Sequence, residues 1–300
     1  MGKRWATVAA RQALHGAGKL GLQVCYGASG RPKCFCKAGY VILPLVMRLR
    51  LIISYDGAPF LGWQSQLKGD TVQGVVERAF FKIVGRRVIV HGASRTDAGV
   101  HALAQCAHAD IPDGRMDLSD WRRALNANLP GAVRILKVLQ TASSFHARFA
   151  SIGKIYRYRI WNSEVLPPLE RGRVWHVPNF LDFGALRSNV TLFEGRHNFV
   201  SFAVNGSNNT DNTVRTLRTV QISRCSGGEV RLTFEGEGFL YKMIRVLTGT
   251  LVRLGQKKED IGWVSRLLLG SSVKRRKSLC IAPAQGLYLV RVLYGRKPKC

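Results

Sequence analysis

One short loop holds residue types that suit nucleophilic chemistry. The segment Gly92–His101 reads GASRTDAGVH, with Asp97 its only acid and Arg95 two positions earlier. A neighbouring cation favours the charged form of a carboxylate, so Asp97 would stay ionised and able to attack carbon. Glycines on both sides allow a tight turn or the close approach of a ligand. A lone aspartate can equally brace its own loop, and the loop alone leaves both roles open.

A second candidate group lies on the strand predicted at 154–161. Tyr156 and Tyr158 alternate there with Arg157 and Arg159. Successive side chains on a strand point to opposite faces, so the tyrosines share one face and the arginines the other. Bases stack on aromatic rings and arginines bind phosphates, which would suit RNA. The structural alternative is an edge strand whose tyrosines pack in the core.

Two further cations interrupt an apolar helix predicted at 239–254. Lys242 and Arg245 are three residues apart and so lie on one side of it. Charged side chains in such places usually extend along their apolar stems to solvent. They could instead reach into a cleft and pair with a carboxylate.

The sequence contains no recognisable metal or disulfide framework. His91, His101 and His108 match no common metal-site spacing. The seven cysteines are an odd number, are scattered along the chain and complete no zinc motif. We therefore expect reduced cysteines without a bound metal.

The charge balance favours a polyanionic partner. Lys and Arg total 46 against 18 Asp and Glu in 300 residues, a formal net charge of +28. Each phosphate that a protein cation neutralises releases counterions and adds affinity, so nucleic acid is the favoured partner over general basicity. Hydrophobic residues make up 46% of the chain, enough for a sizeable core.

The elements that must position these residues suggest two similar halves in an α+β fold. For 47–145, the patterns predict strands at 48–55, 87–91, 105–111 and 133–139, and helices at 72–84 and 118–126. The order strand, helix, strand, strand, helix, strand is that of a split β-α-β sandwich, an antiparallel sheet with helices on one face. For 146–295, they predict strands at 154–161, 216–223, 229–235 and 286–294, and helices at 181–192, 239–254 and 260–269. Residues 201–213 predict a mobile loop, and 296–300 a short tail.

The first 46 residues fall outside this pattern. They contain several Lys and Arg but no acid, which is typical of a mitochondrial or plastid transit peptide. Alternatively, the mature protein starts at Met47, where a clean strand pattern begins, and acts in the cytoplasm. We favour the second alternative and expect 1–46 to be disordered. The longest apolar run, Val41–Met47, contains Pro44 and is too short to span a bilayer, so no membrane partner is expected.

Several motifs, in order, carry a family resemblance. The segment Ser94–His101 is similar to the signature of the tRNA pseudouridine synthase A family. The other matching segments are Tyr55–Gly57, Gly62–Gln64, Thr71–Gly74, Leu125–Pro130, Phe145–Phe149, Tyr156–Tyr158, Phe239–Leu240 with Met243–Arg245, and Gly286–Val290. The resemblance covers residues 47–294.

This resemblance implies a pseudouridine synthase fold, in which two sheet-plus-helix subdomains flank a central basic cleft. It implies that Asp97 is the catalytic nucleophile and that Arg245 pairs with it. Arg95 would help to flip the target base and take its place. Tyr156 would stack on that base and could assist proton removal at carbon five.

The implied reaction is the isomerisation of uridine to pseudouridine in the anticodon stem-loop of tRNA. The resemblance implies that it needs neither cofactor nor metal and that the protein is a homodimer. The alternative is a non-catalytic RNA-binding or RNA-folding protein on the same fold. Intact Asp97, Tyr156 and Arg245 favour the enzyme.

Overall fold

The computed structural model describes residues 23–26, 32–35, 46–112, 116–204, 212–269 and 280–295. The chain divides into two compact units, 1–46 with 112–115 and 47–111 with 116–300. In the first unit, β1 (Gln23–Tyr26) and β2 (Pro32–Phe35) form an antiparallel pair. The sequence predicts no element there, because strands of four residues each are too short to show a pattern.

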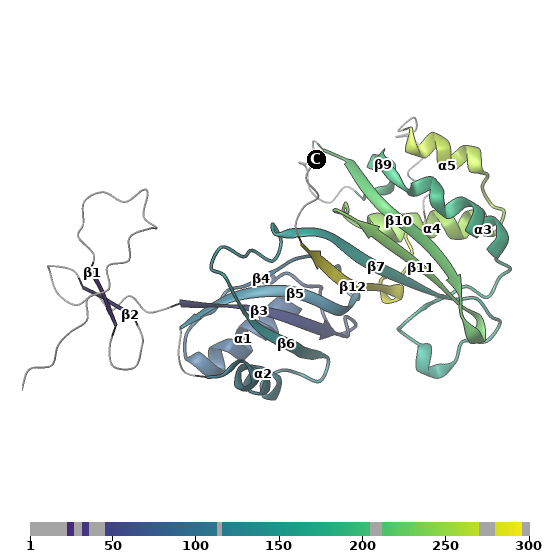
Figure 1. Cartoon of the computed structure of the whole chain (residues 1–300). Coiled ribbons are helices and arrows are strands. Elements are labelled where there is room, and N and C mark those ends of the chain that lie inside the picture. The colour runs from purple at the N-terminus through teal and green to yellow at the C-terminus, as the bar shows by residue number, and fades with distance from the viewer. Residues whose placement is uncertain are drawn as a thin grey trace, which may run out of the picture. The chain divides into compact units, whose positions relative to one another are not determined.

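The first half of the second unit has the predicted split β-α-β order. Its elements are β3 (Val46–Tyr55), α1 (Val72–Val84), β4 (Val90–Gly92), β5 (His101–Pro112), α2 (Leu118–Ala127) and β6 (Val133–Thr141). The sheet order is β6-β3-β5, with β4 also paired to β5. The β3–β6 and β4–β5 pairs are antiparallel, and α1 and α2 lie against this part of the sheet (Figure 1).

Local sequence explains why α1 has the bounds that the pattern predicts. The Thr71 side chain accepts a hydrogen bond from the Gly74 N–H and so caps the first turn. Gly85 ends the helix in the left-handed conformation, which glycine adopts without steric cost. The buried face consists of Val72, Val75, Val76, Ala79 and Phe80.

The second half continues the same sheet. Its elements are β7 (Ser151–Trp161), β8 (Trp175–His176), α3 (Phe183–Asn189), β9 (Gly195–Asn198), β10 (Val214–Arg224), β11 (Glu229–Gly236), α4 (Met243–Gly255), α5 (Ile261–Leu268) and β12 (Leu287–Tyr294). The strand order β5-β12-β7-β11-β10-β9 places the last strand between the halves. β12 is parallel to β5 and antiparallel to β7, so one ten-stranded sheet spans both halves.

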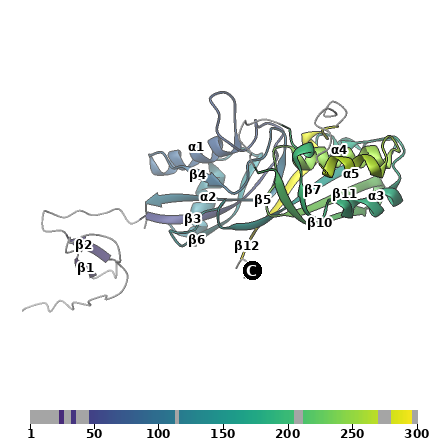
Figure 2. The same cartoon turned by 90° about the horizontal axis from the view of Figure 1, so that it is seen from above.

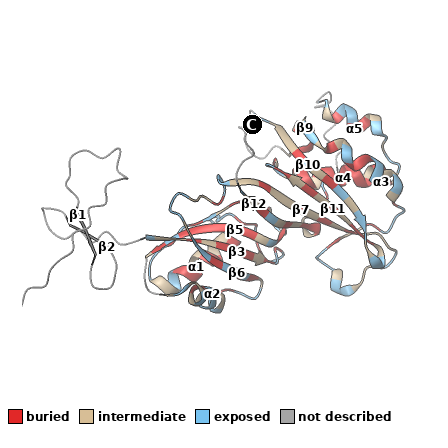
Figure 3. Cartoon of the chain, in the orientation of Figure 1, coloured by how far each residue is buried: buried red, intermediate tan, exposed pale blue. Residues whose placement is uncertain are grey.

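The helices α3, α4 and α5 cover the second half of the sheet (Figures 1 and 2). Most residues of α4 are buried, and buried residues also follow the middle of the long strands (Figure 3). Among the described residues, every helix is too short or too polar to cross a bilayer.

Among the predicted boundaries that are wrong, three have a local reason. The helix predicted from Phe239 begins only at Met243, because Lys242 has a left-handed φ of 58° that cannot continue a helix. The helix predicted over 181–192 ends at Asn189 and tightens into a 3₁₀ turn, Val190–Phe193, whose first two residues are β-branched. In the predicted loop 201–213, Ser201 and Phe202 are buried in a 3₁₀ turn, while residues 205–211 lie outside the described residues.

Candidate active site

The loop that carries Asp97 is fixed at both ends in the sheet. Gly92 is the last residue of β4, and His101 is the first residue of β5, which starts earlier than the predicted Gln105. The Ala93 N–H donates to the Cys106 carbonyl at 2.8 Å. The side-chain amide of the buried Gln105 donates to the Ser94 carbonyl at 2.6 Å. These bonds tie the start of the loop to β5.

A second loop, Gly62-Trp63-Gln64, braces the centre of the Asp97 loop. The Trp63 N–H donates to the Thr96 carbonyl at 3.1 Å. The Thr96 hydroxyl also forms a buried hydrogen bond of 2.8 Å with the Tyr55 hydroxyl. A Cβ atom on Gly62 would lie 2.5 Å from the Thr96 carbonyl oxygen, so this close approach requires glycine. Thr96, the residue before Asp97, is therefore tied to a rigid framework through both its backbone and its side chain.

The two glycines that flank Asp97 have different roles. Gly99 has a φ of +76° and makes the tight turn that the sequence predicts. Gly92 does not leave space for a ligand, because a Cβ there would meet the Trp63 ring at 2.4 Å. The expectation that Gly92 allows a ligand such as RNA to approach closely is therefore wrong, because the Trp63 indole already occupies the space beside its Cα.

Asp97 forms an ion pair with Arg245 from α4. The Arg245 Nη1 lies 3.1 Å from the Asp97 Oδ2, and the two side chains are only 14% and 20% exposed. The Arg245 Nε donates to the Ala282 carbonyl at 2.7 Å, which fixes the plane of the guanidinium. The carboxylate is thus held by one hydrogen bond from an oriented cation. Lys242 instead stays outside α4, with its ammonium 4.9 Å from the centre of the Tyr241 ring.

Tyr156 lies beside this pair on β7. This strand is central, between β12 and β11, so the alternative of an edge strand is wrong. The ring is 6% exposed, and its hydroxyl shares a 2.7 Å hydrogen bond with the Ser94 hydroxyl. Burial raises the pKa of Tyr156 to about 12, against a lowering by the Ser94 bond, and the nearby Asp97 charge raises it further. The phenol is therefore protonated at neutral pH.

Two of the other alternating residues of β7, Tyr158 and Arg159, are structural. Tyr158 is fully buried and donates to the Pro283 carbonyl at 2.7 Å. Arg159 pairs with Glu229 at 2.6 Å and with Glu170 at 2.8 Å. Since two carboxylates already bind the Arg159 guanidinium, that cation is not free to bind a phosphate.

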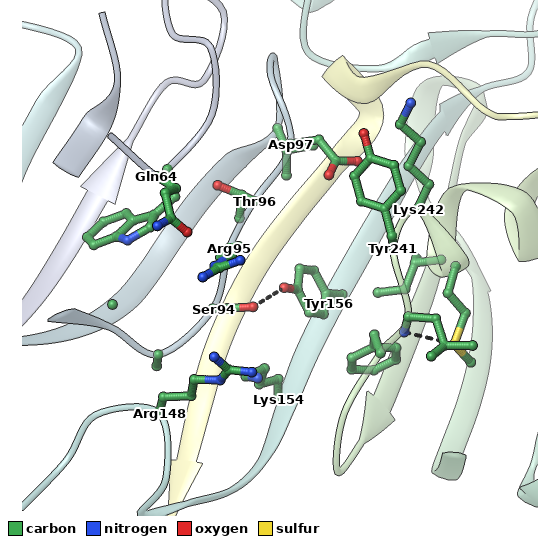
Figure 4. Close-up of a pocket in the computed structure, with 18 of the residues that line it drawn as sticks. Gln64, Ser94, Arg95, Thr96, Asp97, Arg148, Lys154, Tyr156, Tyr241 and Lys242 are labelled. Carbon is green, nitrogen blue, oxygen red and sulfur yellow. Dashed lines mark hydrogen bonds between the residues drawn. The ribbon is translucent and has the colours of Figure 1, made fainter. Parts of the chain in front are cut away.

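A cavity of about 1000 Å³ opens beside Asp97. The Asp97 loop forms one wall, and the others come from 61–66, the turn 146–149, β7 and the segment 239–244 (Figure 4). Among the described residues that line it, the cations are Arg95, Arg148, Lys154, Arg215 and Lys242, and the one acid is Asp97. Arg95 is exposed and pairs with no carboxylate in the described part of the chain. The cavity is therefore a basic site that contains a single, paired carboxylate.

Comparisons with known proteins show which family the chain belongs to. The family model described as tRNA pseudouridine synthase matches residues 51–150 and 190–295. The chain belongs to the tRNA pseudouridine synthase family. A tRNA pseudouridine synthase A of Akkermansia muciniphila is 41% identical over 252 residues, which cover 82% of this chain and 95% of that protein. The protein of the same name from Solidesulfovibrio magneticus is 44% identical over 254 residues, covering 83% and 91%.

A chain of a solved Cbf5-Nop10-Gar1 complex aligns with 68% of this chain and 45% of its own length. The identity is 13% and the TM-score 0.31, too low to support any argument. The family match itself includes Arg95, Asp97 and Arg245, whereas Tyr156 lies between the two matched segments. In this member of the tRNA pseudouridine synthase family, Tyr156 is therefore placed beside the cavity by its bond to Ser94 and its position in the lining.

The sequence analysis missed one lining residue of this cavity, Lys154, and one contact, between Ser94 and Tyr156. Lys154 lies on the same face of β7 as Tyr156, two residues earlier, so the period of the strand could have revealed it. Burial, with a smaller contribution from the Arg148 charge, lowers the pKa of Lys154 to about 8. The bond between Ser94 and Tyr156 could not have been found, because it joins residues far apart in sequence. In the described ranges, no three His, Cys, Asp or Glu side chains are placed to hold a metal.

Proposed function

We propose that this protein isomerises uridine to pseudouridine in the anticodon stem-loop of tRNA, with Asp97 as the nucleophile. The Asp97–Arg245 pair beside a basic cavity is the observation that carries the proposal. The cations would attract the RNA backbone. Among the described residues of the lining, Asp97 is the one acid, and its pairing with Arg245 would reduce its repulsion of the RNA.

The reaction makes definite demands on the site. The bond between N1 of uracil and C1′ of ribose breaks, the uracil rotates, and a bond forms between C5 and C1′. The proton on C5 is lost and N1 ends protonated. An ionised Asp97 could add to the sugar or to the base, or remove a sugar proton, and each route needs the carboxylate within the cavity. The target base must also leave its stack, which costs a few kcal/mol.

The neighbouring side chains suit the remaining steps. Arg95 is exposed next to Asp97, where it could fill the space that a flipped base leaves. The Tyr156 ring is fixed by Ser94 and by an edge contact with Phe239, with ring centres 5.2 Å apart. A base that enters the cavity could stack on this ring. Because the phenol is neutral, proton removal at C5 by Tyr156 would first require loss of its own proton.

The proposal also includes the assembly and location that the family resemblance implies. These are a homodimer that acts in the cytoplasm, with an organelle as the alternative if 1–46 act as a transit segment. Light scattering on the purified chain tests the dimer, because a monomeric mass at micromolar concentration would contradict it. Mass spectrometry of the mature N-terminus tests the location.

The decisive experiment uses Asp97→Asn and an anticodon stem-loop RNA with tritium at carbon five of uridine. Tritium release measures loss of that hydrogen, and filter binding measures affinity for the RNA. We expect Asp97→Asn to abolish release while the Kd stays within about threefold of wild type. The control is Asp120→Asn, which removes an exposed acid on α2. Tritium release by Asp97→Asn would contradict the assignment, and RNA binding without release by wild type would favour the non-catalytic alternative.

A further inference from the structure

Phe149 places an apolar ring at the cavity wall, in the turn between β6 and β7. The residue lines the cavity and is 72% exposed. Single exposed apolar residues are common and need no explanation. Phe149 differs because its ring rests on another ring. The His146 imidazole lies beneath it, with centroids 4.3 Å apart and planes inclined at 32°.

The imidazole of His146 is itself firmly held. The N–H groups of Arg148 and Phe149 both approach its Nδ1, at 3.2 Å and 3.3 Å. A ring nitrogen that accepts hydrogen bonds carries no proton, so His146 is neutral in this arrangement. Burial, then the nearby charge of His91, lowers the pKa of His146, which favours the same state.

Two further imidazoles support His146, one from the buried His108 and one from the exposed His91. His146 contacts His108 at 4.6 Å between ring centres, and His108 stacks on His91 at 4.9 Å. His108 is buried and accepts from the Ala147 N–H at 3.2 Å. Burial, then His146 and His91, lowers the pKa of His108 to about 4. Phe149 thus lies at the outer side of a cluster of rings that the buried His108, on β5, anchors in the sheet.

Two cations lie beside this platform. The Arg148 guanidinium carbon is 5.6 Å from the centre of the Phe149 ring. Arg148 and Lys154 lie next to each other in the cavity (Figure 4). Within the described ranges, neither cation pairs with a carboxylate, whereas Arg159 and Arg245 both do. A partly buried ammonium without a counter-ion is unfavourable, and a phosphate would supply that counter-ion.

The platform is separated from the reacting centre. The hydrogen-bonded Ser94 and Tyr156 side chains lie between Asp97 on one side and Arg148 with Lys154 on the other (Figure 4). A base that stacks on Phe149 is therefore not the one that Asp97 attacks. It would belong to a neighbouring nucleotide of the same strand.

We propose that Phe149, His146, Arg148 and Lys154 form a second nucleotide subsite. Phe149 stacks on an unpaired base next to the flipped uridine, and the two cations bind the phosphate of that nucleotide. Stacking on a phenyl ring accepts any base, so the subsite holds RNA in register without selecting sequence. The inference rests on the proposed function, because it takes RNA as the substrate.

The test compares Phe149→Ala, Phe149→Leu and Phe149→Trp for their Kd with the stem-loop RNA. Since one base stacked on an aromatic ring contributes about fivefold to hundredfold in affinity, Phe149→Ala and Phe149→Leu should both weaken binding by at least fivefold. Phe149→Trp should bind within twofold of wild type. Phe180→Ala is the matched control, because Phe180 is 71% exposed but does not line the cavity. Thermal melting confirms that each variant folds.

Abasic substitutions in the RNA identify the partner of Phe149. At one position beside the target uridine, an abasic nucleotide should weaken binding to the wild-type protein by the same factor as Phe149→Ala does with intact RNA. The same abasic RNA should bind Phe149→Ala no more weakly than intact RNA does. The subsite is refuted if Phe149→Ala binds like Phe180→Ala, if leucine restores affinity, or if every abasic effect persists in Phe149→Ala. Since Kd is measured, these outcomes can be read even if the wild-type protein releases no tritium, which would instead contradict the proposed reaction.

Discussion

Replacement of Arg245 by methionine tests whether the ion pair positions Asp97 for the reaction. Methionine keeps an unbranched apolar stem but removes both the bond to the Ala282 carbonyl and the bond to Asp97. Asp97 would keep its backbone position, because the loop is held by Gln105 and Trp63. Its carboxylate would lose the hydrogen bond from Arg245 that orients it.

The expected loss follows from the geometry of the pair. A hydrogen bond between charged groups contributes about 1.5 to 3 kcal/mol, and the 3.1 Å distance with side chains 14% and 20% exposed suits that range. This corresponds to a fall in rate of about tenfold to hundredfold. Arg245→Lys should give an intermediate rate, since one ammonium cannot serve both Ala282 and Asp97 in the planar geometry of a guanidinium.

The assay is single-turnover tritium release with excess enzyme, which isolates the chemical steps from product release. Arg253→Met is the matched control: it lies on the same helix and pairs with Glu259 at 2.6 Å, away from the cavity. The control should keep the wild-type rate. A rate within threefold of wild type for Arg245→Met, or an equal loss in Arg253→Met, would refute the reasoning.

Three further predictions use other features of the chain. Gly62→Ala should destabilise the fold in urea by more than Gly85→Ala, which also has a positive φ but nothing near its Cβ and should cost about 1 kcal/mol; equal costs would contradict the close approach to Thr96. Because the pKa of Lys154 is lowered to about 8, its charge is lost as pH rises through 8, so RNA affinity should fall between pH 7 and 9 in wild type but not in Lys154→Met. Hydrogen bonds from Arg231 and Arg159 outweigh burial and lower the pKa of Glu229 from 4.5 to about 2. Its stabilisation, roughly 3 kcal/mol, is therefore complete above pH 4.5 and lost as pH falls through 2, so the deficit of Glu229→Gln in denaturation experiments should shrink from pH 7 to pH 3.

Patterns among neighbouring residues predicted those helices and strands that neighbouring residues determine. The bounds of α1 follow from Thr71, Gly85 and the apolar face between them. The alternation along β7 correctly placed Tyr156 and Tyr158 on one buried face. The start of α4 could not be predicted, because Lys242 adopts a left-handed backbone that its side chain does not favour.

Long-range pairing is what the sequence could not reveal. Nothing in the residues of β12 indicates that the last strand inserts between β5 and β7. For the same reason, the carboxylate partners of Arg159 were hidden, since Glu229 and Glu170 lie on other segments. The Asp97–Arg245 pair was expected only through the family resemblance, because no spacing rule connects a loop with a helix so far along the chain.

One chain of contacts links the core to the Asp97 carboxylate. The Tyr158 hydroxyl, fixed on the central strand β7, donates to the Pro283 carbonyl. The adjacent Ala282 exchanges two hydrogen bonds with Arg245, accepting from its Nε and donating to its carbonyl. Arg245 then donates to Asp97. The segment at Pro283 can lie this close only because Gly286 has no side chain, as a Cβ there would meet the Tyr158 ring at 2.6 Å. The orientation of Asp97 therefore depends on residues outside the cavity lining, and the same central strand that presents Tyr156 to the cavity also fixes the cation that pairs with Asp97.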